Sequence, residues 1–118
     1  MNQKQKSLPD FHKKILSVVP VGKRSAIPIS YMIDKLGLTV QDRRKVSMAL
    51  SELIFEYGYP IGSSSDDNTK GVFLIENEDD LRVACRTLNS RATQVLKRHR
   101  KIIENFNDQE QIRGDFVG

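Results

Sequence analysis

The stretch from Asn77 to Phe106 contains neither proline nor glycine, and this uninterrupted segment limits the folds open to the chain. Within it, apolar residues recur at seven-residue spacing, namely Leu81, Leu88, Val95 and Ile102, with Ala84, Ala92 and Phe106 nearby. The pattern predicts one helix, capped by Asn77 and longer than a typical globular helix. Because 118 residues make about one domain, we expect only the first half of this helix to pack on the rest.

Beyond about Val95 this helix would extend past the surface of a small domain, and its apolar side would be exposed. An exposed stripe predicts a partner helix, and a symmetric homodimer is the commonest arrangement. The expected dimer contacts are Val95, Ile102 and Phe106. The densest basic run of the chain contains Lys97, Arg98, Arg100 and Lys101. It has two interpretations, a contact to a nucleic-acid backbone or a solvated helix surface.

Cysteine content and hydropathy exclude several classes of protein. The single cysteine, Cys85, can neither close a disulfide within the chain nor supply a cysteine-based metal cage. No apolar run approaches the roughly 20 residues that a membrane-spanning helix needs. The segment from Met1 to Ser7 is polar and lacks the apolar core of a signal peptide. We therefore expect a soluble intracellular protein.

Charge is distributed unevenly, although the net charge is only +4. Residues 1–24 hold six Lys or Arg against Asp10, and residues 81–101 hold seven without an acid. Residues 58–80 hold one lysine against six carboxylates. The two basic stretches favour an acidic partner, and a purely solubilising surface is the alternative.

Apolar spacing and turn residues divide the rest of the chain into short elements. In chain order we expect helix Phe11–Val19, an edge β segment Ser25–Ile29, helix Tyr31–Leu36, a helix from Thr39 to Tyr57, and strands Tyr59–Gly62 and Gly71–Ile75. The expected N-caps are Asp10, Ser30 and Thr39, with Asp42 completing a loose capping box at Thr39. Gly37 and Gly58 are expected to end the second and third helices. The third helix carries an apolar stripe of Val46, Ala49, Leu50, Leu53, Ile54 and Tyr57.

Several motifs in the middle of the chain suggest a family. They are Ile29 to Gly37, Arg44-x-Val46-x-x-Ala49-Leu50-x-x-Leu53, Gly58-Tyr59-Pro60-Ile61-Gly62-Ser63, Gly71-Val72-Phe73-Leu74, and the entry Glu78-Asp79-Asp80-Leu81 to a helix with Leu88-x-Ser90-Arg91-Ala92. Through them the chain resembles the small winged-helix DNA-binding proteins of phages and prophages. The resemblance implies an α+β winged helix-turn-helix with a two-stranded wing and a long C-terminal helix. It also implies a role in phage DNA replication or transcriptional regulation, in the cytoplasm or nucleoid of a bacterial host.

The expected domain organisation follows from this resemblance and from the helical pattern. Residues 1–9 would form a flexible basic arm, residues 10–76 the winged-helix domain, residues 77–106 the long C-terminal helix, and residues 107–118 a disordered tail.

In a helix-turn-helix the first turns of the third helix enter the major groove of double-stranded DNA. Six residues there face away from the apolar stripe or border it: Gln41, Arg43, Arg44, Lys45, Ser47 and Met48. Arg44 and Gln41 are candidate base readers, because arginine can bond guanine and glutamine can bond adenine. Arg43 and Lys45 are expected to reach phosphates. Further DNA contacts are expected from Lys23, Arg24 and Lys70.

The predicted wing is poorly suited to phosphate, since Asp66 and Asp67 lie at its tip. The alternative function is therefore a winged-helix module that binds a protein, such as a replication factor of the host or phage. Catalysis is not expected, because His12 and His99 lack neighbouring ligand or nucleophile partners. We interpret His12 as a surface residue and Cys85 as a small buried hydrophobe. Neither a metal nor a cofactor is expected.

Overall fold

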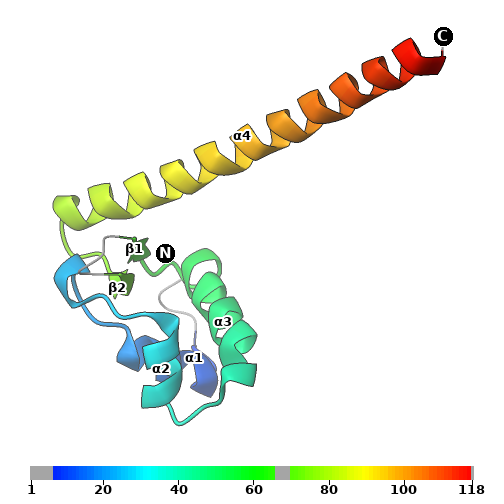
Figure 1. Cartoon of the computed structure of the whole chain (residues 1–118). Helices are drawn as coiled ribbons and strands as arrows, with labels where there is room; N and C mark the ends of the chain where they lie inside the picture. Colours follow the sequence, from blue (N-terminus) through cyan, green and yellow to red (C-terminus); the bar gives the residue numbers. More distant parts are fainter. Residues whose placement is uncertain (1–6, 66–69, 118) are drawn as a thin grey trace. The chain divides into compact units, whose positions relative to one another are not determined.

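The computed structural model describes residues 7–65 and 70–117, which form an α+β structure with four α-helices and a two-stranded antiparallel sheet (Figure 1). The elements are α1 (Asp10–Val18), α2 (Ile29–Lys35), α3 (Arg43–Phe55), β1 (Ile61–Ser64), β2 (Gly71–Leu74) and α4 (Glu78–Val117). Two short 3₁₀ turns, η2 (Lys23–Ser25) and η3 (Val40–Asp42), precede α2 and α3. The predicted α+β class is confirmed. The predicted N-terminal arm lies largely outside the described residues.

The chain divides into two compact units, Met1–Thr87 and Leu88–Gly118, and α4 contributes to both. The first unit contains α1, α2, α3, the hairpin β1–β2 and the first turns of α4. The second unit is formed by the remainder of α4.

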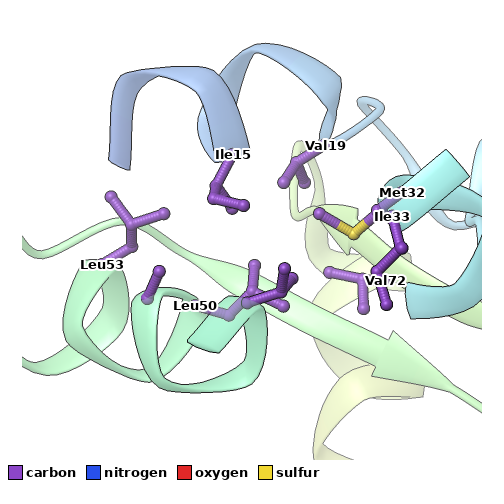
Figure 2. Close-up of a cluster of buried hydrophobic side chains, with 9 residues drawn as sticks. Ile15, Val19, Met32, Ile33, Leu50, Leu53 and Val72 are labelled. Carbon is purple, nitrogen blue, oxygen red and sulfur yellow. The ribbon is translucent and has the colours of Figure 1, made fainter. Parts of the chain in front are cut away.

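The core of the first unit lies where α1, α2 and α3 pack together. It consists of Ile15, Val19, Met32, Ile33, Val46, Ala49, Leu50, Leu53 and Val72. Figure 2 shows the helix side chains of this cluster converging, with Val72 of β2 beside them. The α3 members recur at three- and four-residue spacing, which confirms most of the predicted stripe. Ile54 departs from it, because its side chain is 39% exposed.

Two of the four predicted helix N-caps are wrong. The N-cap residues of α1 and α2 are Pro9 and Pro28, both in extended conformation, with ψ of 154° and 157°. The Pro28 carbonyl accepts the N–H groups of Tyr31 and Met32, at 3.0 and 3.2 Å. Proline suits this position because its fixed φ is compatible with entry into a helix. Asp10 and the predicted cap of α2 therefore lie inside their helices.

The third predicted cap, Thr39, caps the 3₁₀ turn η3 that leads into α3, whereas the N-cap of α3 itself is Asp42. The Thr39 backbone N–H donates to Asp42 Oδ2 at 3.0 Å, and the Thr39 hydroxyl donates to the same oxygen at 3.3 Å. This capping box stabilises the start of η3, which leads directly into α3. Gly37 and Gly58 lie just beyond the ends of α2 and α3 with φ of 69° and 75°. Both glycines end their helices as predicted, in the left-handed conformation that other residues rarely adopt.

The hairpin begins later than predicted. β1 starts at Ile61, because the Tyr59 N–H donates to the Leu53 carbonyl at 3.0 Å and belongs to the turn that closes α3. In the antiparallel register Ile61 faces Leu74 and Ser64 faces Gly71. Residues 66–69 of the predicted connecting loop lie outside the described residues.

The β segment predicted over Ser25–Ile29 is reduced to a single bridge. The Ile27 N–H donates to the Val72 carbonyl at 3.1 Å, and the Val72 N–H returns a bond to the Ile27 carbonyl at 2.7 Å. The segment does not extend into a strand because the residues before it coil into η2.

The hairpin is buried on both faces. Val72 belongs to the core of the three helices, and Phe73, the next residue, is fully buried on the opposite face of the strand. Gly62 is the register partner of Phe73. A Cβ atom at Gly62 would lie 2.6 Å from the Ala84 Cβ. The second face of the hairpin is therefore the one that approaches α4.

The start of α4 confirms one prediction and corrects another. The Asp80 N–H donates to Asn77 Oδ1 at 2.8 Å, so Asn77 caps the helix as predicted. The face that is buried in the first unit consists of Asp80, Val83, Ala84 and Thr87. Of the stripe expected on the first half of the helix, Ala84 is buried as expected, whereas Leu81 and Leu88 are 49% and 59% exposed. The two leucines lie on a different side of the helix from the buried set.

The far end of α4 also differs from the prediction. The helix continues through Val117, past the end expected at Phe106 and through most of the predicted tail. The segment that follows Asn107 is polar but contains no proline, and its first residues, Asp108 to Gln111, are compatible with a helix.

Asp80 ties the first turn of α4 to two neighbouring segments. Its side chain is almost fully buried, at 2% exposure. Oδ1 accepts the backbone N–H of Lys23 in η2 at 3.2 Å, and Oδ2 accepts the backbone N–H of Glu76 at 3.0 Å. The Asp80 carboxylate thus links the start of α4 to η2 and to the segment that precedes the helix.

Replacing Asp80 with alanine is expected to lower the free energy of unfolding by about 1–3 kcal/mol, because two part-buried N–H groups lose their acceptor. The matched control is Asp79→Ala, since the Asp79 side chain is 66% exposed and bonds Arg82 on the helix surface at 2.7 Å. That exposed pair contributes at most about 1 kcal/mol. Urea denaturation of the two variants measures the difference, and equal losses would contradict the role of Asp80.

Candidate nucleic-acid interface

The start of α3 presents a polar and basic surface. All six side chains predicted to face DNA there are exposed: Gln41, Arg43, Arg44, Lys45, Ser47 and Met48. The same two turns bury Val46, Ala49 and Leu50 in the core. Because opposite sides of one short helix are anchored and exposed in this way, packing in the core fixes the position of the six side chains.

One flank of α3 is held against α1. The Lys45 ammonium lies 4.5 Å from the centroid of the Phe11 ring, a cation–π contact. His12 Nε2 and Glu52 Oε1 are 2.7 Å apart, which links the two helices again two turns further along α3. Lys45 is therefore the member of the six that contacts α1.

The other flank of α3 adjoins α2 and the turn between the helices. A cavity of about 430 Å³ lies there and is lined by Ser30, Ile33, Asp34, Leu38, Thr39, Val40 and Arg43. Arg44, Ser47 and Met48 share the ridge between the two flanks, since residues three and four apart are neighbours on a helix. Among the described residues, Arg43 and Arg44 form no ion pair. Their guanidinium groups are thus available to an external anion.

The remaining predicted DNA contacts of the first unit lie elsewhere. Half-buried Lys23 and exposed Arg24 are in η2, which is tied to β2 through the Gly22 N–H and the Leu74 carbonyl at 2.8 Å. Exposed Lys70 immediately precedes β2. Figure 1 shows the hairpin beside the C-terminal end of α3, away from its first turn. The structure therefore brings together the six residues of η3 and the start of α3 and places these three outside that surface.

The predicted contacts of α4 lie in the second unit. Lys97, Arg98, Arg100 and Lys101 are all exposed, as are Val95, Ile102 and Phe106. The prediction that Cys85 is buried is wrong, because the side chain is exposed. Its position follows from the phase of α4, whose buried side carries Val83, Ala84 and Thr87 instead.

Sequence reasoning missed two features of the first unit. His12, predicted to be a surface residue, has a side chain only 14% exposed, and its ring centroid lies 5.8 Å from that of Tyr57. Its partner Glu52 is forty positions away, so no local pattern pointed to the pair. Phe55 and Val40 are 74% and 83% exposed, which places two large apolar side chains on the surface at the two ends of α3. Phe55 lies outside the apolar stripe predicted for the third helix, and this was the signal in the sequence that could have indicated its exposure.

The described residues hold no cluster of three or more His, Cys, Asp or Glu side chains that could bind a metal ion. None of the helices in residues 7–65 and 70–117 has the length and apolar character needed to cross a membrane. Comparison of the chain with protein-family models, curated proteins and solved structures gave no match.

Proposed function

We propose that the chain binds double-stranded DNA through a winged helix-turn-helix, with α2 and α3 as the helix pair and the hairpin β1–β2 as the wing. The observation that carries this proposal is the exposed basic start of α3, where Arg43 and Arg44 have no acidic partner among the described residues. An unpaired guanidinium gains more from a phosphate or a base edge than one already held by a carboxylate.

The roles within the α3 surface follow from the reach of each side chain. Arg44 lies on the outward ridge, where bidentate bonding to guanine is sterically open, and Gln41 at the helix entry suits adenine. Arg43 and Lys45, on the two flanks, are assigned to phosphates on either side of the groove. The apolar Met48 adds a surface for a thymine methyl group.

The hairpin and η2 supply a weaker second contact. Lys70, Lys23 and Arg24 are the basic side chains of this region, but residues 58–80 also hold six carboxylates, and the hairpin strands themselves are uncharged. Most of the specificity is therefore assigned to α3. The basic run of α4 from Lys97 to Lys101 is proposed as an additional phosphate contact that is independent of base sequence. A role in phage replication or in transcriptional regulation is compatible with this mode of binding.

The test is fluorescence anisotropy of the full chain with a pool of random duplexes at two salt concentrations, followed by selection of preferred sequences. Binding that weakens steeply with salt supports phosphate contacts. A preference that persists in the selected duplexes supports base reading by α3. Absence of binding to every duplex at low salt would contradict the proposal.

Arg44→Ala is expected to weaken binding to the selected duplex by about 1–3 kcal/mol and to relax discrimination at one base pair. The control is Arg82→Ala, which removes an equal charge from the surface of the same unit, where Arg82 pairs with Asp79. Titrations of both variants and the parent against matched and substituted duplexes measure the effect. If Arg44→Ala binds as tightly as the parent, Arg44 does not read a base.

A second candidate function is a protein-binding module for a replication factor. It is favoured by the exposed apolar side chain of Phe55 at the C-terminal end of α3, which has no role in the proposed DNA contact. This function predicts that duplex binding is absent and that Phe55→Ala, rather than Arg44→Ala, reduces binding to the partner protein.

A further inference from the structure

The second unit carries an uncovered apolar surface along one side of α4, here called the α4 stripe. Its members, with their exposed fractions, are Leu88 (59%), Val95 (67%), Leu96 (55%), Ile102 (60%), Ile103 (47%) and Phe106 (62%). Each of the side chains described from Leu88 to Gln111 is exposed. The six positions share one side of a helix. An apolar surface of this extent marks a contact site.

The opposite side of α4 is polar. Lys97, Lys101 and Glu104 lie there by helical geometry, and the Lys101 ammonium is 3.7 Å from Glu104 Oε1. This part of the helix is therefore amphipathic, and one face only is suited to burial. His99 is the polar member within the stripe, between Val95 and Ile102.

Charge along this segment is separated into two halves. Residues 88–101 carry five basic side chains and no carboxylate: Arg91, Lys97, Arg98, Arg100 and Lys101. Residues 102–111 carry three carboxylates and no basic side chain: Glu104, Asp108 and Glu110. A parallel pair of such helices in register would place like charge beside like charge. An antiparallel pair would place the basic half of each helix along the acidic half of the other. Because Lys97, Lys101 and Glu104 lie on the side opposite the stripe, this is an attraction between the two halves and not a set of ion pairs across the contact.

We infer that the α4 stripe binds a second copy of this chain, with the two helices antiparallel. The two-fold axis passes between Arg100 and Lys101, near the centre of the run from Val95 to Phe106. In this register Val95 packs on the partner's Phe106, and His99 packs on the partner's Ile102. Leu96 then lies beside the partner's Ile103, so the flanking apolar residues are covered as well. Such a contact is self-complementary, as a two-fold interface requires.

The first experiment is sedimentation velocity of the full chain without DNA, from low to high micromolar concentration. A monomer–dimer equilibrium is expected. Val95→Asp, which places a charge in the interface, is expected to raise the dimer dissociation constant about 100-fold or more. The matched control is Thr93→Asp, also at an exposed β-branched position of α4 but away from the stripe. Circular dichroism verifies that both variants keep the helix content of the parent at concentrations where each is monomeric.

A monomer at all concentrations would overturn the inference. So would equal dissociation constants for Val95→Asp and Thr93→Asp, because the contact would then lie elsewhere. The inference does not depend on DNA binding, and the experiment contains no DNA. A monomer that still binds duplex DNA would contradict the dimer alone, and a dimer that binds no duplex would contradict the proposed function alone.

The second experiment tests the antiparallel orientation by disulfide cross-linking. In a Cys85→Ser background, single cysteines are introduced by Val95→Cys in one preparation and by Phe106→Cys in another. Oxidation of the mixture is expected to give a cross-linked dimer that contains both variants, because these positions face each other across the interface. A cross-linked dimer formed efficiently by Val95→Cys alone would indicate parallel helices and overturn the orientation.

Discussion

Phe73→Ala is expected to lower the free energy of unfolding by about 3–5 kcal/mol, the largest loss we expect from a core truncation in this chain. Phe73 is the largest of the fully buried side chains and lies on the face of β2 away from the three-helix core. Its register partner Gly62 has no side chain to fill a vacated space. The cavity left by alanine would therefore remain between the hairpin and the first turns of α4.

The matched control is Phe55→Ala, which removes the same side chain from a position that is 74% exposed. Its effect is expected to stay within about 0.5 kcal/mol of the parent. Urea denaturation followed by far-ultraviolet circular dichroism measures both variants. Similar losses for the two would show that the second face of the hairpin does not contribute to the core.

Gly71→Ala is expected to destabilise the first unit by about 3 kcal/mol or more, through steric overlap and backbone strain combined. A Cβ atom there would lie 2.1 Å from the carbonyl carbon and 2.2 Å from the carbonyl oxygen of Ile27. Gly71 also has φ of 136°, which other residues rarely adopt. The neighbouring atoms are backbone, so they cannot yield as a flexible side chain would. The bridge between Ile27 and Val72 would be forced apart.

Gly37→Ala provides the comparison, because Gly37 also has positive φ, at 69°, but a Cβ atom there would meet nothing within 4 Å. Strain without overlap is expected to cost about 1–2 kcal/mol. The difference between the two variants, measured by thermal or urea denaturation, isolates the close approach of β2 to Ile27. If the two glycines prove equally replaceable, that approach is not important for stability.

The features that the sequence predicted correctly are those determined over a few residues. The capping box of Thr39 and Asp42 and the cap at Asn77 depend on side chains within four positions of the backbone groups they bond, and the helix ends at Gly37 and Gly58 depend on the positive φ of a single residue. Exposure of the basic start of α3 was also predictable, because the buried positions of one amphipathic helix determine its exposed positions.

The features that the sequence did not predict depend on partners far along the chain. In α4, spacing alone could not indicate that Val83 is buried together with Ala84 while Leu81 and Leu88 are exposed. The buried side carries the Asp80 carboxylate, which accepts the N–H of Lys23 more than fifty positions away. Cys85 was predicted to be buried from its residue type alone, whereas its position on α4 exposes it. The link between His12 and Glu52 is likewise a tertiary contact without a local signature.

The continuity of α4 across the two units has a further consequence for how its second part forms. An isolated helix must first close a turn, a step with a statistical weight of about 10⁻³ in helix–coil theory. Here the first turns of α4, up to Thr87, are already held by the folded first unit. Residues from Leu88 onward therefore extend an existing helix and require only the propagation step of helix formation. Helix order in the second unit is thereby templated from its N-terminal end, and the same sequence detached from the first unit would lose that nucleus.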